Sequence, residues 1–197
     1  MCIYGASSSQ LSLVGQKCNN LFVRKVFWIL LLSGVSFTAT AQTVVNDPNA
    51  VKFKIKNFGV WVEGSFSGLK GEIRFDPLDP TNALFDVTID ATSIETGIDL
   101  RDKHLRKEEY MDIKNYPLLK FTSSSDVKGD KQNVWILSGH LTIKRITKEI
   151  SFPFLFEQKD GHNLFLGEFM VNRRDFSVGG KSLSMADELR VILNVQN

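Results

Sequence analysis

The chain has only two cysteines, and both lie near its amino-terminal end. Cys2 and Cys18 precede a run of apolar residues, and residues 42–197 contain no cysteine. If the chain is cleaved after Ala41, the mature protein can have no disulfide and no cysteine that acts as a nucleophile or metal ligand. Because neither cysteine directly follows the apolar run, a lipid-modified bacterial lipoprotein is not expected.

Long apolar segments are also missing. The run over residues 26–37 is about 12 residues long, whereas a membrane-spanning helix needs ~20. It follows Arg24 and Lys25 and precedes the small residues Ala39-Thr40-Ala41, which is the layout of a secretory signal peptide. We therefore expect a cleaved signal peptide over residues 1–41 and one periplasmic or secreted domain over residues 42–197, with no permanent membrane anchor. A retained anchor is the alternative.

Neither charge sign dominates the chain. The sequence has 24 Lys and Arg against 22 Asp and Glu, and removal of the three basic residues in the signal segment leaves a net charge of about −1. Binding to a phosphate backbone needs a strongly basic surface, so we exclude nucleic acid as a partner.

Residue patterns that support catalysis or metal binding are absent as well. His104, His140 and His162 are far apart and lack the spacing of zinc ligands, so no metal site is expected. Residues 64–68 resemble the nucleophile turn of a serine hydrolase, but Phe66 stands at the serine position. We expect no enzyme activity and no resident cofactor. A periplasmic hydrolase, the alternative, would depend on Asp102 and His104 alone.

Alternating apolar and polar residues predict β-strands along the rest of the chain. Val51, Phe53 and Ile55 alternate with lysines, and the same two-residue period recurs over residues 71–76, 85–90, 150–156 and 189–195. Further strand-like runs cover residues 60–68, 118–125, 134–143 and 164–171. With turns expected at 76–80, 128–130 and 160–161, these runs predict an all-β antiparallel domain, either a barrel or a sandwich. A short helix is expected within residues 98–111.

Phenylalanine is concentrated on the apolar side of these strands. Of the 12 phenylalanines in residues 42–197, eight are assigned to that side: Phe53, Phe66, Phe75, Phe85, Phe121, Phe152, Phe154 and Phe156. A small barrel can fill itself with side chains or hold one ligand, and periodicity alone favours the packed core. At ~0.8 kcal/mol per methylene, a five-carbon isoprene unit would offset a substantial part of an association cost of ~4–15 kcal/mol. An outer-membrane barrel fits less well, because its apolar side would face lipid and the strands here are short.

Two polar clusters interrupt the strands. In the first, helical spacing would place Arg101 and His104 on one face. The second, residues 172–176, follows a strand and includes Arg173. A solvated helix and a hydrogen-bonded turn are the simpler interpretations. The alternative places Arg101 or His104 at a barrel mouth, where they would meet the polar head of a ligand.

The order of these segments resembles the YceI-like family of exported bacterial proteins. The matching segments are Gly64-x-Phe66-x-x-Leu69-x-Gly71-x-Ile73-x-Phe75-Asp76-Pro77, Val87-Thr88-Ile89-Asp90, Arg101-Asp102-x-His104-Leu105, Tyr116-Pro117-x-x-x-Phe121 and Asn172-Arg173-x-Asp175-Phe176. The resemblance covers roughly residues 47–197. It implies an antiparallel eight-stranded lipocalin-like barrel with one short helix, an apolar tunnel, bound polyisoprenoid or related lipid, and frequent homodimers.

On this resemblance we expect a protein that carries or sequesters a polyisoprenoid, an isoprenoid quinone or a similar long-chain amphiphile. A packed barrel that serves as an interaction or stress-response module without bound lipid is the alternative. Asn57 stands where the family usually has histidine, and Arg145 and Ser177 replace common glycines. The expected tunnel residues are Phe53, Phe66, Phe75, Phe85, Val87, Ile89, Phe121, Phe152, Phe154 and Phe156, and the expected head-group contacts are Arg101, His104 and Arg173.

Overall fold

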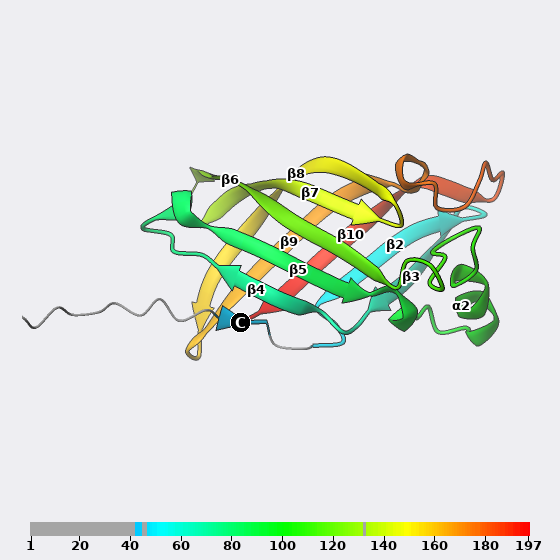
Figure 1. Cartoon of the computed structure of the whole chain (residues 1–197), viewed down its shortest axis with the longest axis horizontal. Helices are drawn as coiled ribbons and strands as arrows, with labels where there is room; N and C mark the ends of the chain where they lie inside the picture. Colours follow the sequence, from blue (N-terminus) through cyan, green and yellow to red (C-terminus); the bar gives the residue numbers. More distant parts are fainter. Residues whose placement is uncertain (1–41, 45–46, 132) are drawn as a thin grey trace, which may run out of the picture. The chain divides into compact units, whose positions relative to one another are not determined.

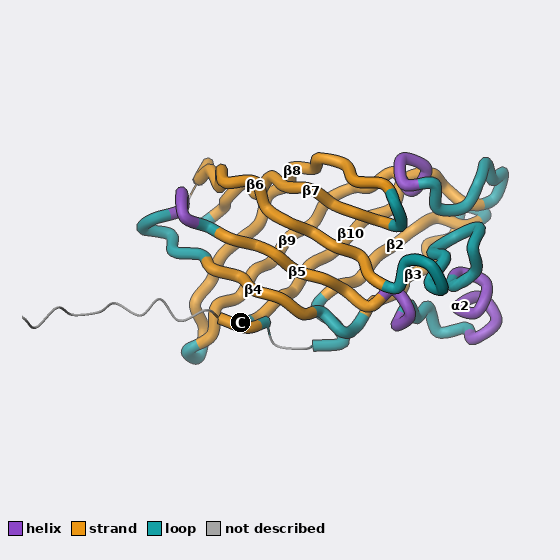
Figure 2. The backbone as a smooth tube through the Cα atoms, viewed as in Figure 1, coloured by secondary structure: helices purple, strands orange, loops and turns teal. Residues whose placement is uncertain are grey.

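The alternating segments form the strands of one antiparallel sheet (Figures 1 and 2). The computed structural model describes residues 42–44, 47–131 and 133–197, within the unit Thr40–Asn197, and the predicted signal peptide lies outside the described residues. The strands of this part are β1 (Gln42–Thr43), β2 (Val51–Asn57), β3 (Val60–Phe66), β4 (Lys70–Arg74), β5 (Leu84–Asp90), β6 (Leu118–Lys131), β7 (Val134–Ile143), β8 (Ile146–Lys159), β9 (His162–Asn172) and β10 (Met185–Gln196).

The sheet contains nine strands of five or more residues and the two-residue β1, within the described residues. Its order is β1-β4-β5-β6-β7-β8-β9-β10-β2-β3, and it curls strongly into a half-barrel. The five alternating runs and the four further strand-like runs of the sequence correspond one to one to β2–β10. The count of eight strands, which came from the family resemblance, is wrong, and so is full closure. The consecutive strands β3 and β4 end up at or near opposite edges of the sheet, with no ladder of hydrogen bonds between them.

The predicted helix is shorter than expected. Helix α2 spans Asp99–Leu105, and residues 106–116 continue as turns. Asp112 adopts a φ of +49°, which is incompatible with a right-handed helix. Short 3-10 turns, η1 (Pro80–Asn82), η2 (Ala91–Ser93) and η3 (Arg173–Phe176), complete the helical elements of the described chain. None of the helices in this part combines the length and apolarity that crossing a membrane requires.

Two of the predicted turns have different outcomes. Asp160-Gly161 joins β8 to β9 with φ values of +52° and +81°, the left-handed pair that a tight hairpin requires. Residues 128–130 were expected to be a turn but belong to β6, where Gly129 pairs with Trp135 of β7. The Trp135 ring would lie 3.0 Å from a Cβ at this position, so the glycine makes room for the indole across the strands.

The two ends of the half-barrel differ, and they are named here for later use. The helix end carries α2, η3 and the β2–β3 and β7–β8 hairpins, and it lies on the right in Figure 1. The far end carries the β4–β5 connection and the β6–β7 and β8–β9 hairpins. The larger cluster of buried side chains includes Phe85, Phe154 and Phe165, whereas a smaller cluster around Ala91, Ile94, Met111 and Leu119 lies beneath the helix end.

A short latch ties the end of β3 to residues 93–95, which lie between β5 and α2. The backbones of Ser65 and Glu95 exchange two hydrogen bonds of 2.8 and 3.1 Å. The Ser93 hydroxyl donates to the Ser67 carbonyl at 3.0 Å and accepts from the Ser67 N–H at 2.9 Å. Gly64 permits this close approach, because a Cβ there would lie 2.8 Å from the Glu95 carbonyl and 2.3 Å from the Phe53 ring.

We expect Gly64→Ala to destabilise the domain by about 1–3 kcal/mol, since the added methyl must displace either the backbone of the latch or the Phe53 ring. Urea denaturation monitored by tryptophan fluorescence measures this change. Gly180→Ala is the matched control, because no atom lies within 4 Å of its would-be Cβ. Equal stability of the two variants would show that the latch accommodates an added methyl group at position 64.

Candidate ligand-binding cavity

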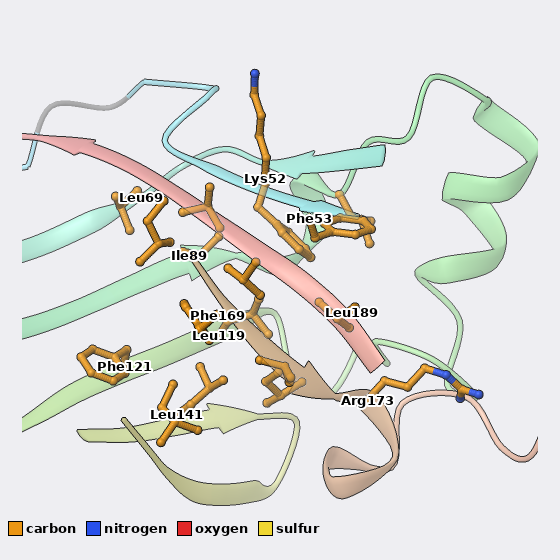
Figure 3. A pocket seen from close by; sticks show the side chains of 18 of the residues that line it. Lys52, Phe53, Leu69, Ile89, Leu119, Phe121, Leu141, Phe169, Arg173 and Leu189 are labelled. Carbon is orange, nitrogen blue, oxygen red and sulfur yellow. The ribbon is translucent and has the colours of Figure 1, made fainter. Parts of the chain in front are cut away.

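The curled sheet encloses an apolar cavity of about 260 Å³ (Figure 3). Each of the nine longer strands contributes side chains to its wall. An apolar cavity of ~150 Å³ already binds a ring the size of benzene and stays dry. The interior is therefore not filled by its own side chains, and this observation argues against the packed-barrel alternative.

Inward-pointing side chains at alternate positions of each strand form the wall of the cavity. On β5, Val87 and Ile89 point inward, and on β6 the same is true of Phe121. These side chains are only partly buried although they point away from bulk solvent, because their inner surfaces border the cavity. Phe152 of β8 and Phe169 of β9 stack with ring centroids 4.3 Å apart and form a flat section of the wall.

Aromatic rings close the far end of the cavity. Phe75 contacts five other rings with centroid distances of 5.0–6.3 Å: Phe85, Trp135, Phe154, Phe156 and Phe165. Four of these contacts are edge-to-face, the arrangement that the ring quadrupoles favour. This cluster, called the aromatic plug, blocks the half-barrel beyond Phe85 and Phe154.

Eight of the ten predicted tunnel residues border the cavity: Phe53, Phe66, Phe85, Val87, Ile89, Phe121, Phe152 and Phe154. Phe75 and Phe156 do not, because both rings are packed into the aromatic plug. Lining residues outside the prediction include Leu69, Leu119, Leu141, Phe169, Leu189 and Val191. Most of them share the inward period of their strands, which is the signal that could have identified them.

Polar side chains border the cavity mainly at the helix end. Arg101 of α2 donates from Nε to the Thr96 hydroxyl and from Nη2 to the Thr96 carbonyl, both at 2.6 Å. The Thr96 hydroxyl in turn donates to the buried carboxylate of Asp102. The Asn57 Oδ1 atom is buried without a hydrogen-bond partner among the described residues. Lys52 also borders the cavity, but its ammonium group points away from it (Figure 3).

Arg173 plays a different part from the one predicted. Its side chain is 2% exposed, and its guanidinium donates to five backbone carbonyls between residues 178 and 186 at 2.6–3.3 Å. It also pairs with Asp187 at 2.9 Å. Since these contacts engage all three of its nitrogens, the guanidinium holds the loop over residues 178–187, and only the side-chain stem reaches the cavity.

His104 lies on the outer surface of α2, away from the cavity lining. Its ring is exposed and contacts Tyr110 with a centroid distance of 5.0 Å. Among the described residues, no three histidine, cysteine or acidic side chains converge on a position where a metal could bind. The helix end therefore brings Arg101 and Tyr110 to the cavity and leaves His104 outside it.

Comparison with known proteins adds to this geometry. A family model described as the YceI-like domain matches residues 41–197. The chain belongs to the YceI-like family. Protein YceI of Salmonella arizonae is similar, with 30% identity over 154 residues that cover 74% of this chain and 79% of the relative.

Solved structures of two proteins share this YceI-like fold. BcnA of Burkholderia cenocepacia superimposes with a TM-score of 0.71 at 24% identity, over 78% of this chain and 99% of BcnA. A polyisoprenoid binding domain from Saccharophagus degradans superimposes with a TM-score of 0.61 at 15% identity, over 80% of this chain and 98% of that domain. At these identities the likeness shows the fold.

Asn57, Arg145 and Ser177, the three residues that the resemblance did not lead us to expect, all lie at the helix end. Asn57 borders the cavity, whereas Arg145 and Ser177 lie in turns. Ser177 adopts a φ of +54°, a conformation that glycine accepts more easily. The neighbouring Lys144 donates to the carbonyls of Glu108 and Ser177 at 3.0 and 3.3 Å, which ties these turns together.

Proposed function

We propose that this protein binds a polyisoprenoid, an isoprenoid quinone or a similar long-chain lipid, and carries or sequesters it outside the cytoplasm without chemical change. The apolar cavity is the observation that carries the proposal. The related fold of the Saccharophagus degradans polyisoprenoid binding domain supports it. Export through the predicted signal peptide supplies the location.

The shape of the cavity suggests how the ligand lies. The tail would extend from the helix end toward the aromatic plug, in contact with Phe53, Phe121 and Phe152. Each buried methylene contributes ~0.8 kcal/mol, so a tail of a few isoprene units binds tightly without a charged anchor. The polar head would remain at the helix end, near the Arg101 guanidinium and the Asn57 amide.

Extraction of the purified protein with organic solvent, followed by mass spectrometry, tests the proposal. We expect a long-chain isoprenoid or related lipid in the native extract, and uptake of an added polyprenol by delipidated protein. Repeated absence of bound lipid together with no uptake would contradict the proposal.

His104→Ala is expected to leave polyprenol affinity unchanged within about twofold, because the imidazole lies outside the cavity and tail burial dominates binding. Titration of delipidated protein with a fluorescent polyprenol measures the affinity. The same variant tests the hydrolase alternative, since loss of a measurable turnover in this variant would support catalysis by His104.

A further inference from the structure

Large exposed apolar side chains are unevenly distributed over the domain. Among the described residues, eight of the nine lie at or next to the helix end: Phe58, Val60, Trp61, Ile98, Leu100, Leu118, Met170 and Leu183. The ninth, Leu78, lies in the β4–β5 connection at the far end. Single exposed apolar residues are common on protein surfaces, whereas concentration at one end indicates an interaction surface.

Phe58 is the clearest case, because neither packing nor local conformation explains a phenylalanine at this position. It occupies the β2–β3 hairpin turn with a φ of +50°, and Gly59 follows at +79°. Turns of this geometry favour asparagine, aspartate or glycine at the first position. The Phe58 side chain is nevertheless 82% exposed, so its ring adds little to the core.

A second loop lies beside this turn. The Phe58 N–H donates to the Ser184 carbonyl at 2.7 Å, so Leu183 belongs to the segment that contacts the hairpin. Leu183 is fully exposed. Phe58 and Leu183, together called the rim, are thus two apolar residues on adjoining loops at the end where the polar cavity residues lie.

Basic side chains accompany the rim. The face of α2 that carries Arg101 and Leu105 borders the cavity, whereas Leu100 and Lys103 are exposed, as is Lys107 just after the helix. Exposed Asp99, Glu108 and Glu109 balance the lysines of this segment, so the charge next to the rim comes from Lys181, whose loop (residues 177–184) has no acidic residue. Lys181 is exposed in the loop next to Leu183. Neither these three lysines nor Arg101 forms an ion pair within the described part of the chain. Apolar side chains mixed with unpaired cations are typical of surfaces that bind anionic lipid headgroups.

We propose that the helix end docks on an anionic phospholipid bilayer, with Phe58 and Leu183 inserted between the headgroups and the lysines near the lipid phosphates. Side chains that protrude singly from loops suit a soft bilayer better than a flat protein partner. Docking in this orientation would place the helix end of the cavity against the bilayer. The surface lies outside the cavity, so this proposal goes beyond the proposed lipid ligand and is tested separately from it.

Co-sedimentation with vesicles of phosphatidylglycerol and phosphatidylethanolamine, which contain no isoprenoid, tests the docking. We expect the purified protein to sediment with these vesicles and to be released at high salt, because the cationic contribution is screened. The double variant Phe58→Asn, Leu183→Asn should partition at least tenfold more weakly. Asparagine favours the left-handed turn conformation at position 58, so the variant is expected to fold.

Leu78→Asn is the matched control, since Leu78 is 93% exposed at the far end and should not contact the bilayer. Equal loss of sedimentation in the control, or no sedimentation of the unmodified protein, would overturn the docking. The rim could instead contact a second copy of the chain, and analytical ultracentrifugation without vesicles tests this alternative. A dimer that the rim substitutions dissociate, in a protein that does not bind vesicles, would also overturn the docking proposal. Polyprenol uptake in detergent, measured on the same variants, separates failure of docking from failure of ligand binding.

Discussion

Replacement of Leu141 by tryptophan is expected to weaken polyprenol binding about 1,000-fold while the domain remains folded. Leu141 borders the cavity from β7, and its inner surface is only partly covered. An indole at this position would occupy space that about one isoprene unit of the ligand needs. Five carbons at ~0.8 kcal/mol each correspond to about 4 kcal/mol, or three orders of magnitude in Kd. Titration with a fluorescent polyprenol measures the loss.

His140→Trp controls for the size of the new side chain, because His140 lies next to Leu141 on the same strand and is exposed on the outer face. We expect this variant to bind polyprenol as the unmodified protein does. Unfolding curves should show that Leu141→Trp retains a cooperative transition, since its indole enters empty space. Unchanged affinity of folded Leu141→Trp protein would mean that the tail does not enter this cavity.

Arg173→Met is expected to destabilise the domain by about 3–5 kcal/mol, because it leaves five loop carbonyls without their donor and removes one of the two arginines that pair with Asp187. Methionine keeps much of the apolar stem that borders the cavity, so the loss of stability measures the contribution of the guanidinium group. Urea denaturation gives the free energy of unfolding, and hydrogen exchange should show faster exchange over residues 178–187.

Arg174→Met provides the comparison for Arg173→Met. Arg174 is exposed and makes one ion pair, at 3.1 Å to the same Asp187. Exposed ion pairs contribute ~0–1 kcal/mol, so we expect a small effect. Similar losses in the two variants would contradict the structural role assigned to Arg173.

The strands were predictable from the sequence because burial on one face of a sheet imposes a two-residue period. Each of the five alternating and four strand-like runs corresponds to a strand, from Val51–Asn57 to Met185–Gln196. The period does not report contacts between a strand and a distant loop, so it could not show that Ser93 and Glu95 bind the end of β3. Gly129 was misassigned to a turn because its neighbour across the strands, Trp135, is not visible from local sequence.

The site was predictable only in part, for the same reason. Period two identifies which side chains point inward, but it does not show which of them border the cavity, as Phe121 does, and which are packed wholly into the plug, as Phe75 is. That distinction depends on position along the half-barrel. Arg101 and Arg173 look alike as basic residues near strand ends. Only the fold shows that loop carbonyls bind the guanidinium of Arg173, whereas the guanidinium of Arg101 lies at the cavity and bonds to Thr96.

The aromatic plug has a consequence for how a ligand would enter and leave the cavity. Six rings pack together at the far end, so a lipid bound as proposed would enter and leave at the helix end. Under the proposed function, release of one lipid would have to precede uptake of the next, and the lipid would not pass through the domain from end to end. The length of the cavity would also limit the bound part of the ligand: a tail longer than the distance from the helix end to the aromatic plug would leave its remaining carbons outside the protein.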